Sequence, residues 1–244
     1  DLRTLWVDDN SPQSGSAGRI SEAVALVSGS TVNVVAGTYT ERVILDKAML
    51  LLGPNVGIDP VTGTRVAEAE IHTDDLNTHQ AVLIDHADVT VDGLSLYGPN
   101  GSIKDIGAVG LVATSGGPRT NVLVQYNRIF RTSGGTDWNC DGIRMVLTSC
   151  EQASIYIEHN RVQVGTTQPE GNNDVTIADH GYRLTHGATW TVGDPDRVII
   201  RNNHFYGHGK LYLEGIGMLV DQNVFGGIWG PIESISYTRL GGSA

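Results

Sequence analysis

Apolar and polar residues alternate in short segments along most of the chain, and four of these segments share one frame. In each, two apolar residues at alternate positions are followed by an asparagine three residues after the second, and then by a further apolar residue two positions on. These segments span residues 122–130, 155–163, 198–206 and 218–226. The aligned asparagines are Asn127, Asn160, Asn203 and Asn223, and residues 89–97 fit the frame with Leu94 in the asparagine place.

This pattern predicts a repeating strand unit. Alternation over five or six residues is typical of a strand with one buried face. A fixed local frame at irregular spacing suits coils whose strands are constant and whose loops vary in length. Asparagines stacked at a tight bend can hydrogen-bond along the stack, and Asn tolerates the left-handed backbone of such bends. We therefore expect an all-β fold, a single-stranded right-handed parallel β-helix (a β-solenoid). The alternative is an antiparallel sandwich with asparagine-containing turns.

The N-terminal segment predicts a cap for this solenoid. In residues 19–27 one helical face is apolar, and Ser21 offers a hydroxyl near the start of the helix. An alternating strand follows at 31–39. We expect a single domain over 1–244, with an N-terminal cap at 1–30, coils at 31–230 and a C-terminal tail at 231–244. The tail shows no clear cap, so a neighbouring subunit, as in a homotrimer, could cover that end.

Charge narrows the range of partners. Lys plus Arg number 16 and Asp plus Glu number 27, a net charge of −11, and no basic stripe is present, which argues against nucleic-acid binding. No run of apolar residues is long enough to predict membrane insertion. The same negative charge repels acidic polysaccharides unless Ca²⁺ or a local cationic patch intervenes. Cys140 and Cys150 are either bridged, which would indicate an oxidising compartment, or two free buried thiols.

A candidate binding face precedes the asparagine segments. Residues 140–147 and 179–185 align through Gly142 and Gly181, which places Arg144 and Arg183 outward on successive coils. Two adjacent guanidinium groups repel unless a bound anion compensates, so this arrangement predicts a groove for an anionic sugar with Arg144 and Arg183 as its clamp. The alternative is a solvated face on which each arginine pairs with a neighbouring aspartate. Further candidates on or just before this strand are Asp141, His180, His208, Lys210, Tyr212 and Glu214, of which His180, Lys210, Tyr212 and Glu214 would bind substrate.

Residues 34–45, 50–60 and 89–96 resemble the opening coils of secreted bacterial proteins of the pectin-lyase-like superfamily. With the asparagine segments, the resemblance covers most of the chain. It implies the right-handed parallel β-helix and an extracellular, cell-surface or virion-surface location. Lyases, glycoside hydrolases, methylesterases and viral tailspikes all share that fold, so the fold alone assigns no reaction.

Within that resemblance, two enzyme classes have partial motifs. Related lyases use exposed Arg or Lys to remove a proton next to a carboxylate, which implies a catalytic role for Arg144 and Arg183. Residues 139–143 (Asn-Cys-Asp-Gly-Ile), 173–174 (Asn-Asp) and 207–209 (Gly-His-Gly) resemble elements of polygalacturonase-type hydrolases, which implies catalytic roles for Asp141 and His208. The match departs from that family, because only one aspartate stands where two are required and no Arg-x-Lys follows His208. Residues 84–86 resemble a pectate-lyase segment without its aromatic residue, and we expect them to be structural.

No metal or cofactor is required by these patterns. Asp8-Asp9-Asn10, Asp74-Asp75 and Asp174 with Asp179 could supply oxygens to Ca²⁺, but none has the spacing of a recognised loop. Zinc and nucleotide motifs are missing from the sequence. The sequence favours a surface structural protein that presents a face to a glycan or a partner protein. A polysaccharide-degrading enzyme, a lyase before a hydrolase, is the alternative.

Overall fold

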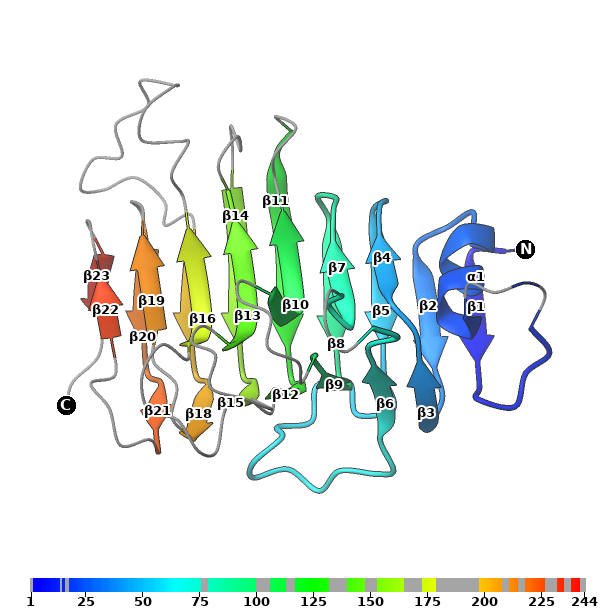
Figure 1. Cartoon of the computed structure of the whole chain (residues 1–244), viewed down its shortest axis with the longest axis horizontal. Coiled ribbons are helices and arrows are strands. Elements are labelled where there is room, and N and C mark those ends of the chain that lie inside the picture. Colours follow the sequence, from blue (N-terminus) through cyan, green and yellow to red (C-terminus); the bar gives the residue numbers. More distant parts are fainter. Residues whose placement is uncertain are drawn as a thin grey trace.

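The computed structural model describes residues 2–13, 15, 18–75, 79–99, 106–112, 117–131, 140–147, 153–164, 173–178, 198–207, 211–214, 218–226, 232–234 and 238–241. Within these residues the chain forms three parallel sheets and one short helix (Figure 1). From the second strand onwards the chain visits the three sheets in a fixed rotation, so each strand pairs with the third strand that follows it. Every pairing between the described strands is parallel, which excludes the antiparallel sandwich.

The largest sheet, which we call sheet A, contains the strand that precedes each asparagine. Its order along the stack is β1 (Thr4–Val7), β2 (Thr31–Val34), β5 (Met49–Leu52), β8 (Val89–Asp92), β11 (Arg119–Gln125), β14 (Ala153–Glu158), β17 (Val198–Arg201), β20 (Met218–Asp221) and β23 (Thr238–Gly241).

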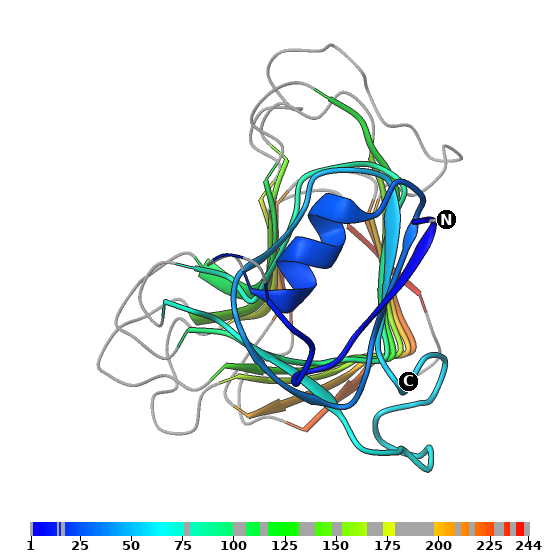
Figure 2. The same cartoon turned by 90° about the vertical axis from the view of Figure 1, so that its right-hand side faces the viewer.

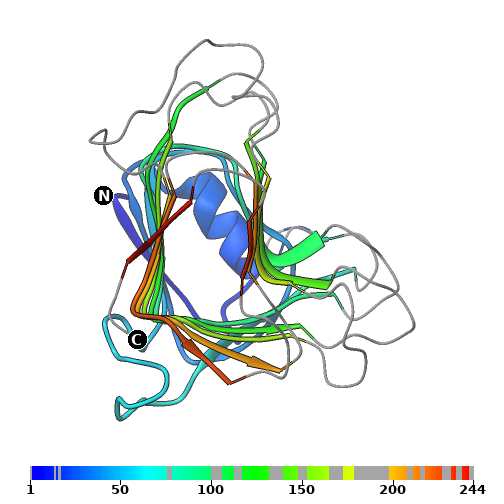
Figure 3. The same ribbon diagram turned by 90° about the vertical axis from the view of Figure 1, so that its left-hand side faces the viewer.

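The other two sheets complete each circuit. Sheet B follows the asparagine and contains β3 (Gly37–Thr40), β6 (Ala69–His72), β9 (Ser95–Tyr97), β12 (Arg128–Arg131), β15 (Arg161–Val164), β18 (His204–Gly207) and β21 (Val224–Phe225). Sheet C contains β4 (Val43–Leu45), β7 (Val82–Ile84), β10 (Ile106–Val112), β13 (Cys140–Val146), β16 (Asn173–Ala178), β19 (Leu211–Glu214) and β22 (Ile232–Ser234). Seen along the stack, the three sheets surround a common interior (Figure 3).

The core is built from apolar side chains that repeat at the same register in successive circuits. Alternate residues of each strand point to opposite faces, so register fixes which ones are buried. In sheet A one inward row runs Leu51, Val91, Val124, Ile157, Ile200 and Val220, and each of these side chains is at most 5% exposed. In sheet B the matching row runs Tyr39, Ile71, Leu96, Ile129, Val162 and Phe205.

The predicted asparagine stack is confirmed. The Oδ1 atom of Asn160 accepts hydrogen bonds from both the backbone N (3.1 Å) and Nδ2 (3.2 Å) of Asn127. Asn203 accepts the same two bonds from Asn160, at 2.9 and 3.1 Å, and Asn223 accepts them from Asn203, at 2.9 and 3.0 Å. Each Nδ2 also donates to a sheet A carbonyl of the preceding circuit, as from Asn160 to Val124 at 2.8 Å. These bonds satisfy buried amide groups at the bend between sheets A and B.

The start of the stack and its backbone also follow the predicted frame. Leu94 occupies the asparagine place and donates its backbone N–H to Asn127 Oδ1 at 3.0 Å. The residue before each stacked position has positive φ, which turns the chain from sheet A into sheet B. This set is Gly93 (φ 74°), Tyr126 (52°), His159 (54°), Asn202 (55°) and Gln222 (51°).

The predicted N-terminal helix is α1 (Arg19–Leu26), and it lies across the opening at that end of the sheets (Figure 2). Its apolar face, with Ile20, Ala23 and Val24, is buried. The helix has no side-chain cap from its own N-terminus. Instead, Glu41 accepts from the backbone N of Ile20 (3.0 Å) and Ser21 (2.8 Å), and from the Ser21 hydroxyl (2.7 Å). No helix among the described residues is long and apolar enough to cross a bilayer.

The sheets extend beyond the expected coil range of 31–230 at both ends. β1 lies inside the expected cap and pairs with β2. β22 and β23 lie inside the expected tail and continue sheets C and A. The sequence pattern did not identify these three strands.

The stack predicts a graded loss of stability. Asn160→Ala leaves the backbone N–H of Asn127 and the carbonyl of Val124 buried without these partners, so the free energy of unfolding should fall by about 3 kcal/mol. Asn223→Ala is the matched control, because Asn223 is partly exposed and water can replace some of its bonds; it should cost about 1 kcal/mol. Urea unfolding of the two variants measures the difference, and equal losses would contradict the ranking.

Candidate functional site

The outer surface of sheet B carries two parallel rows of side chains, and we call this surface the B face. Its strands alternate inward apolar residues with outward ones, so the outward residues of successive circuits line up. The ring row is formed by the residue that follows the inward residue on each strand. It runs His72, Tyr97, Phe130, Gln163 and Tyr206. The cation row follows the asparagine directly and comprises Arg128, Arg161 and His204, after Glu70 and Ser95 in the earlier circuits.

The first three members of the ring row are stacked face to face. The ring centroids of His72 and Tyr97 are 4.2 Å apart with planes 3° from parallel, and those of Tyr97 and Phe130 are 4.8 Å apart at 17°. These distances match the separation of neighbouring strands, roughly 4.8 Å. Burial, with the nearby carboxylates of Glu70 and Glu68, raises the pKa of Tyr97. Because the ring faces cover one another, this row presents mainly ring edges to solvent.

The cation row places Arg128 and Arg161 side by side on neighbouring strands. Arg128 forms an ion pair with Glu68, at 3.2 Å between Nη1 and Oε1. The guanidinium of Arg161 instead lies over the ring of Tyr206, 5.2 Å from its centroid, and its Nε is buried without a hydrogen-bond partner. No described carboxylate forms an ion pair with Arg161. Neighbouring like charges repel, so this pair favours a bound anion.

The carboxylate of Glu68 is fixed by a second arginine beneath the face. Arg65 donates to it twice, at 2.8 and 2.9 Å, and the side chain of Arg65 is only 4% exposed. Burial disfavours ionisation of Glu68, but the hydrogen bonds and charge of Arg65, with the charge of Arg128, outweigh it and lower the pKa of this carboxyl. Arg65 also donates to the carbonyls of Ile58 (2.8 Å) and Tyr126 (2.9 Å).

Two of the catalytic candidates, Asp141 and Arg144, lie on β13 of sheet C, away from the B face. They form an ion pair of 2.9 Å between Arg144 Nη1 and Asp141 Oδ2, and the Asp141 side chain is fully buried. This is the pairing that the alternative interpretation of the arginine face predicts. A guanidinium held by an adjacent carboxylate is poorly suited to act as a base.

The register of sheet C corrects the alignment proposed for the arginine face. The neighbour of β13 is β16, and Arg144 is in register with Thr176 and then Tyr212, so it does not pair with residues 179–185. Tyr212 and Glu214 belong to β19, although the described part of the chain does not include their side chains. Cys140 is the first residue of β13, and its side chain likewise lies outside the described part of the chain. The candidates that lie outside the described residues are His180, Arg183, His208, Lys210 and Cys150.

The segment at 84–86 has the structural role expected of it. Ile84 is fully buried, Asp85 pairs with Arg119 at 2.8 Å, and His86 Nδ1 lies 2.6 Å from the Ala87 carbonyl.

The described candidate Ca²⁺ ligands interact with residues close to them in the sequence. Asp8 accepts from the Asn10 backbone at 2.8 Å, Asp9 from the Asn10 side chain at 2.9 Å, and Asp74 contacts His79 at 2.8 Å. The side chains of Asp174 and Asp179 lie outside the described part of the chain. Where side chains are described, no group of three or more His, Cys, Asp and Glu gathers as a metal site would require.

The B face was missed at the sequence level although its residues were already aligned. Arg128, Arg161 and His204 each follow a frame asparagine, and Phe130 and Tyr206 lie three residues after one. The sequence signal that could have predicted this face was therefore the polar or aromatic character of the outward positions that follow each frame asparagine. The predicted binding face was placed instead on the strand before each asparagine segment, and that strand belongs to sheet C.

Two carboxylates near this face predict opposite pH dependences. Glu68 has a lowered pKa, so its stabilising effect is complete above the ordinary pKa of about 4.3 and is lost as the pH falls through the folded value. Asp92 has a pKa that burial raises, against hydrogen bonds from Gly57 and Gln125, so it reduces stability as the pH rises from about 3.9 through the folded value.

Glu68→Gln should therefore lose more stability at pH 7 than at pH 3, whereas Asp92→Asn should lose less at pH 7 than at pH 3. Urea unfolding across this range, with each variant compared with the wild type, gives the two difference curves. Curves that slope in the same direction would contradict the assignment.

With the geometry established, comparison with known proteins adds no assignment. No family model, curated protein or solved structure matches the chain.

Proposed function

We propose that the chain is a right-handed parallel β-helix that serves as a rigid surface element outside the cytoplasm and binds an acidic polysaccharide along the B face. The rotation through three parallel sheets supports the β-helix, and parallel crossover connections are right-handed in nearly all proteins. The resemblance of its opening coils to secreted pectin-lyase-like proteins supports an extracellular, cell-surface or virion-surface location. Contact with further subunits, as in a homotrimer, stays a prediction.

The observation that carries the proposal is the cation row. On a chain with a net charge of −11, Arg128 and Arg161 stand on adjacent strands, and only Arg128 has a described carboxylate partner. A carboxylate or sulfate group between them would relieve their repulsion and accept hydrogen bonds from both guanidinium groups. The row supplies the local cationic patch that an acidic polymer needs on this protein, so Ca²⁺ is not required for binding.

The ring row favours a sugar polymer over a nucleic acid. Single-stranded nucleic acids bind through bases stacked on exposed aromatic faces. Here both faces of Tyr97, and one face each of His72 and Phe130, are already covered within the row. Ring edges and the apolar C–H groups of a sugar chain can pack together while its acidic groups meet the cation row. The two arginines of the cation row are also few for the contacts that phosphate backbones demand.

Binding without cleavage is the better-supported activity. On the B face Glu68 is held by Arg65 and Arg128, and Glu70 contacts His72 at 3.2 Å. Hydrolysis of a glycosidic bond needs one carboxyl to give a proton and another to act on the opposite side of the sugar. On sheet C, the pairing of Arg144 with Asp141 weakens the case for a lyase.

The test is binding of polygalacturonate, alginate and chondroitin sulfate, measured by affinity electrophoresis and calorimetry. Arg161→Gln should weaken binding roughly tenfold to a hundredfold, because a charge-assisted hydrogen bond is lost. Arg201→Gln on sheet A is the matched control and should bind as the wild type, since Arg201 is an exposed arginine paired with Glu158 at 2.8 Å. Affinity should also fall as the salt concentration rises.

Three results would overturn the proposal. The first is a wild-type protein that binds none of the acidic glycans, and the second is an Arg161→Gln variant that binds them unchanged. The third is the appearance of unsaturated-uronate absorbance during incubation that Arg144→Ala abolishes, which would assign a lyase reaction to sheet C.

A further inference from the structure

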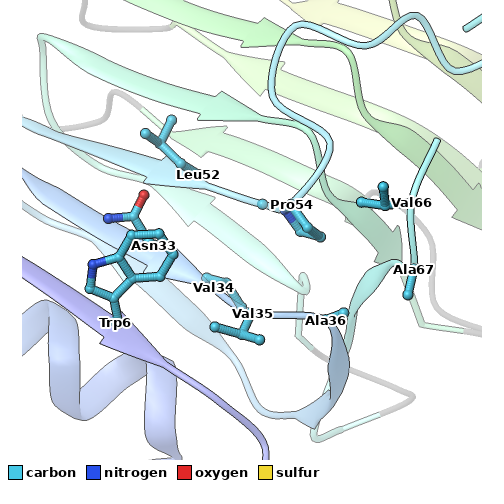
Figure 4. Close-up of a pocket in the computed structure, with 10 residues that line it drawn as sticks. Trp6, Asn33, Val34, Val35, Ala36, Leu52, Pro54, Val66 and Ala67 are labelled. Carbon is cyan, nitrogen blue, oxygen red and sulfur yellow. The ribbon is translucent and has the colours of Figure 1, made fainter. Parts of the chain in front are cut away.

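A hollow on the outer surface of sheet A lies near the N-terminal end of the stack (Figure 4). Its volume is about 480 Å³, within the range of small-molecule binding sites. Trp6 of β1 and Asn33 of β2 form one side, and the connection between β5 and β6 forms the other through Pro54, Val66 and Ala67.

The indole of Trp6 is the most exposed large apolar side chain in the described part of the chain, at 72%. It points outward, in register with Asn33 and Leu52 on the next two strands of sheet A. The opposite wall adds Val66, which is 58% exposed. Unlike the rings of the B face, the indole is not stacked on another described ring, so its face is available to a ligand.

The far wall of the hollow is held rigidly. Asn55 is fully buried and binds both backbone groups of Val66, accepting from its N at 2.8 Å and donating to its carbonyl at 3.2 Å. Gly57 donates to Asp92 at 3.1 Å, and Arg65 fixes the end of the same connection. A preformed site loses little conformational freedom when a ligand binds, which favours affinity.

The chemistry of the lining selects an uncharged ligand with hydroxyl groups. None of the lining residues is ionisable. An acidic group in the hollow would therefore be desolvated without a counter-charge. Asn33 is the polar side chain of the lining, and its amide makes no hydrogen bond within the described structure. An acyl chain would leave that amide unpaired, whereas a sugar hydroxyl would satisfy it.

We propose that this hollow binds a neutral sugar ring, stacked by its C–H face on Trp6 and hydrogen-bonded through a hydroxyl to Asn33. A pyranose offers both an apolar face and a rim of hydroxyl groups, as the indole and the amide require. The hollow shares no lining residue with the ring row or the cation row and takes a different class of glycan, so the two proposals can be tested independently.

The test is calorimetric titration of the full chain with neutral oligosaccharides (cello-, malto-, manno- and xylo-series). Parallel titrations use the oligogalacturonates and a medium-chain fatty acid. Trp6→Ala should weaken neutral-sugar binding about tenfold or more, and Asn33→Ala should weaken it several-fold. Leu26→Ala is the control, because it removes an exposed apolar side chain (61% exposed) that does not line the hollow.

Trp6→Ala should leave acidic-polysaccharide binding by the B face unchanged, and urea unfolding confirms that the variant is folded. The inference is overturned if the wild type binds no neutral oligosaccharide, if Trp6→Ala binds them as well as Leu26→Ala does, or if Trp6→Ala selectively loses the fatty acid instead. Loss of oligogalacturonate binding in Arg161→Gln with neutral binding retained would show that the two sites are distinct.

Discussion

From the circuit of Asn127 to that of Asn223, each circuit is held in register with the next by an asparagine that accepts two hydrogen bonds from the asparagine before it. Because Oδ1 of Asn160 receives both the backbone N and Nδ2 of Asn127, a shift of one residue would break both bonds. It would also turn the inward row of sheet A, such as Val124 and Ile157, toward solvent. Backbone satisfaction at the bend and burial of the core therefore require the same register, and the three sheets follow from it.

The same register has consequences outside the core. It aligns outward residues of successive circuits as strictly as inward ones, so Arg128 meets Arg161 and Tyr97 meets Phe130. Rings gain from this arrangement because they stack at the strand separation. Like charges do not, and the B face compensates one arginine with Glu68 and the other with the ring of Tyr206. A repeat that stabilises the core thus concentrates one kind of chemistry along a surface.

Sequence reasoning succeeded where the signal was local and repeated. The four asparagines, Leu94 in their row and the helix at Arg19–Leu26 all follow from alternation and periodicity. It failed where pairing depends on loop length: residues 173–178, rather than 179–185, lie beside β13, and both segments alternate apolar residues. The cap of α1 by Glu41 and the hollow beside Trp6 depend on contacts between distant segments that no short-range pattern encodes.

Stacked structural repeats usually contact only their neighbours, so the stability of such a stack is close to a sum of nearest-neighbour contributions. Arg65 departs from this, because it lies between β5 and β6 in the second circuit and donates to the carbonyl of Tyr126, after β11 in the fourth. A separate hydrogen bond, from Gly57 to Asp92, links the second circuit to the third. Opening the second circuit would therefore also break a hydrogen bond of the fourth, so these two circuits are coupled although they are not nearest neighbours.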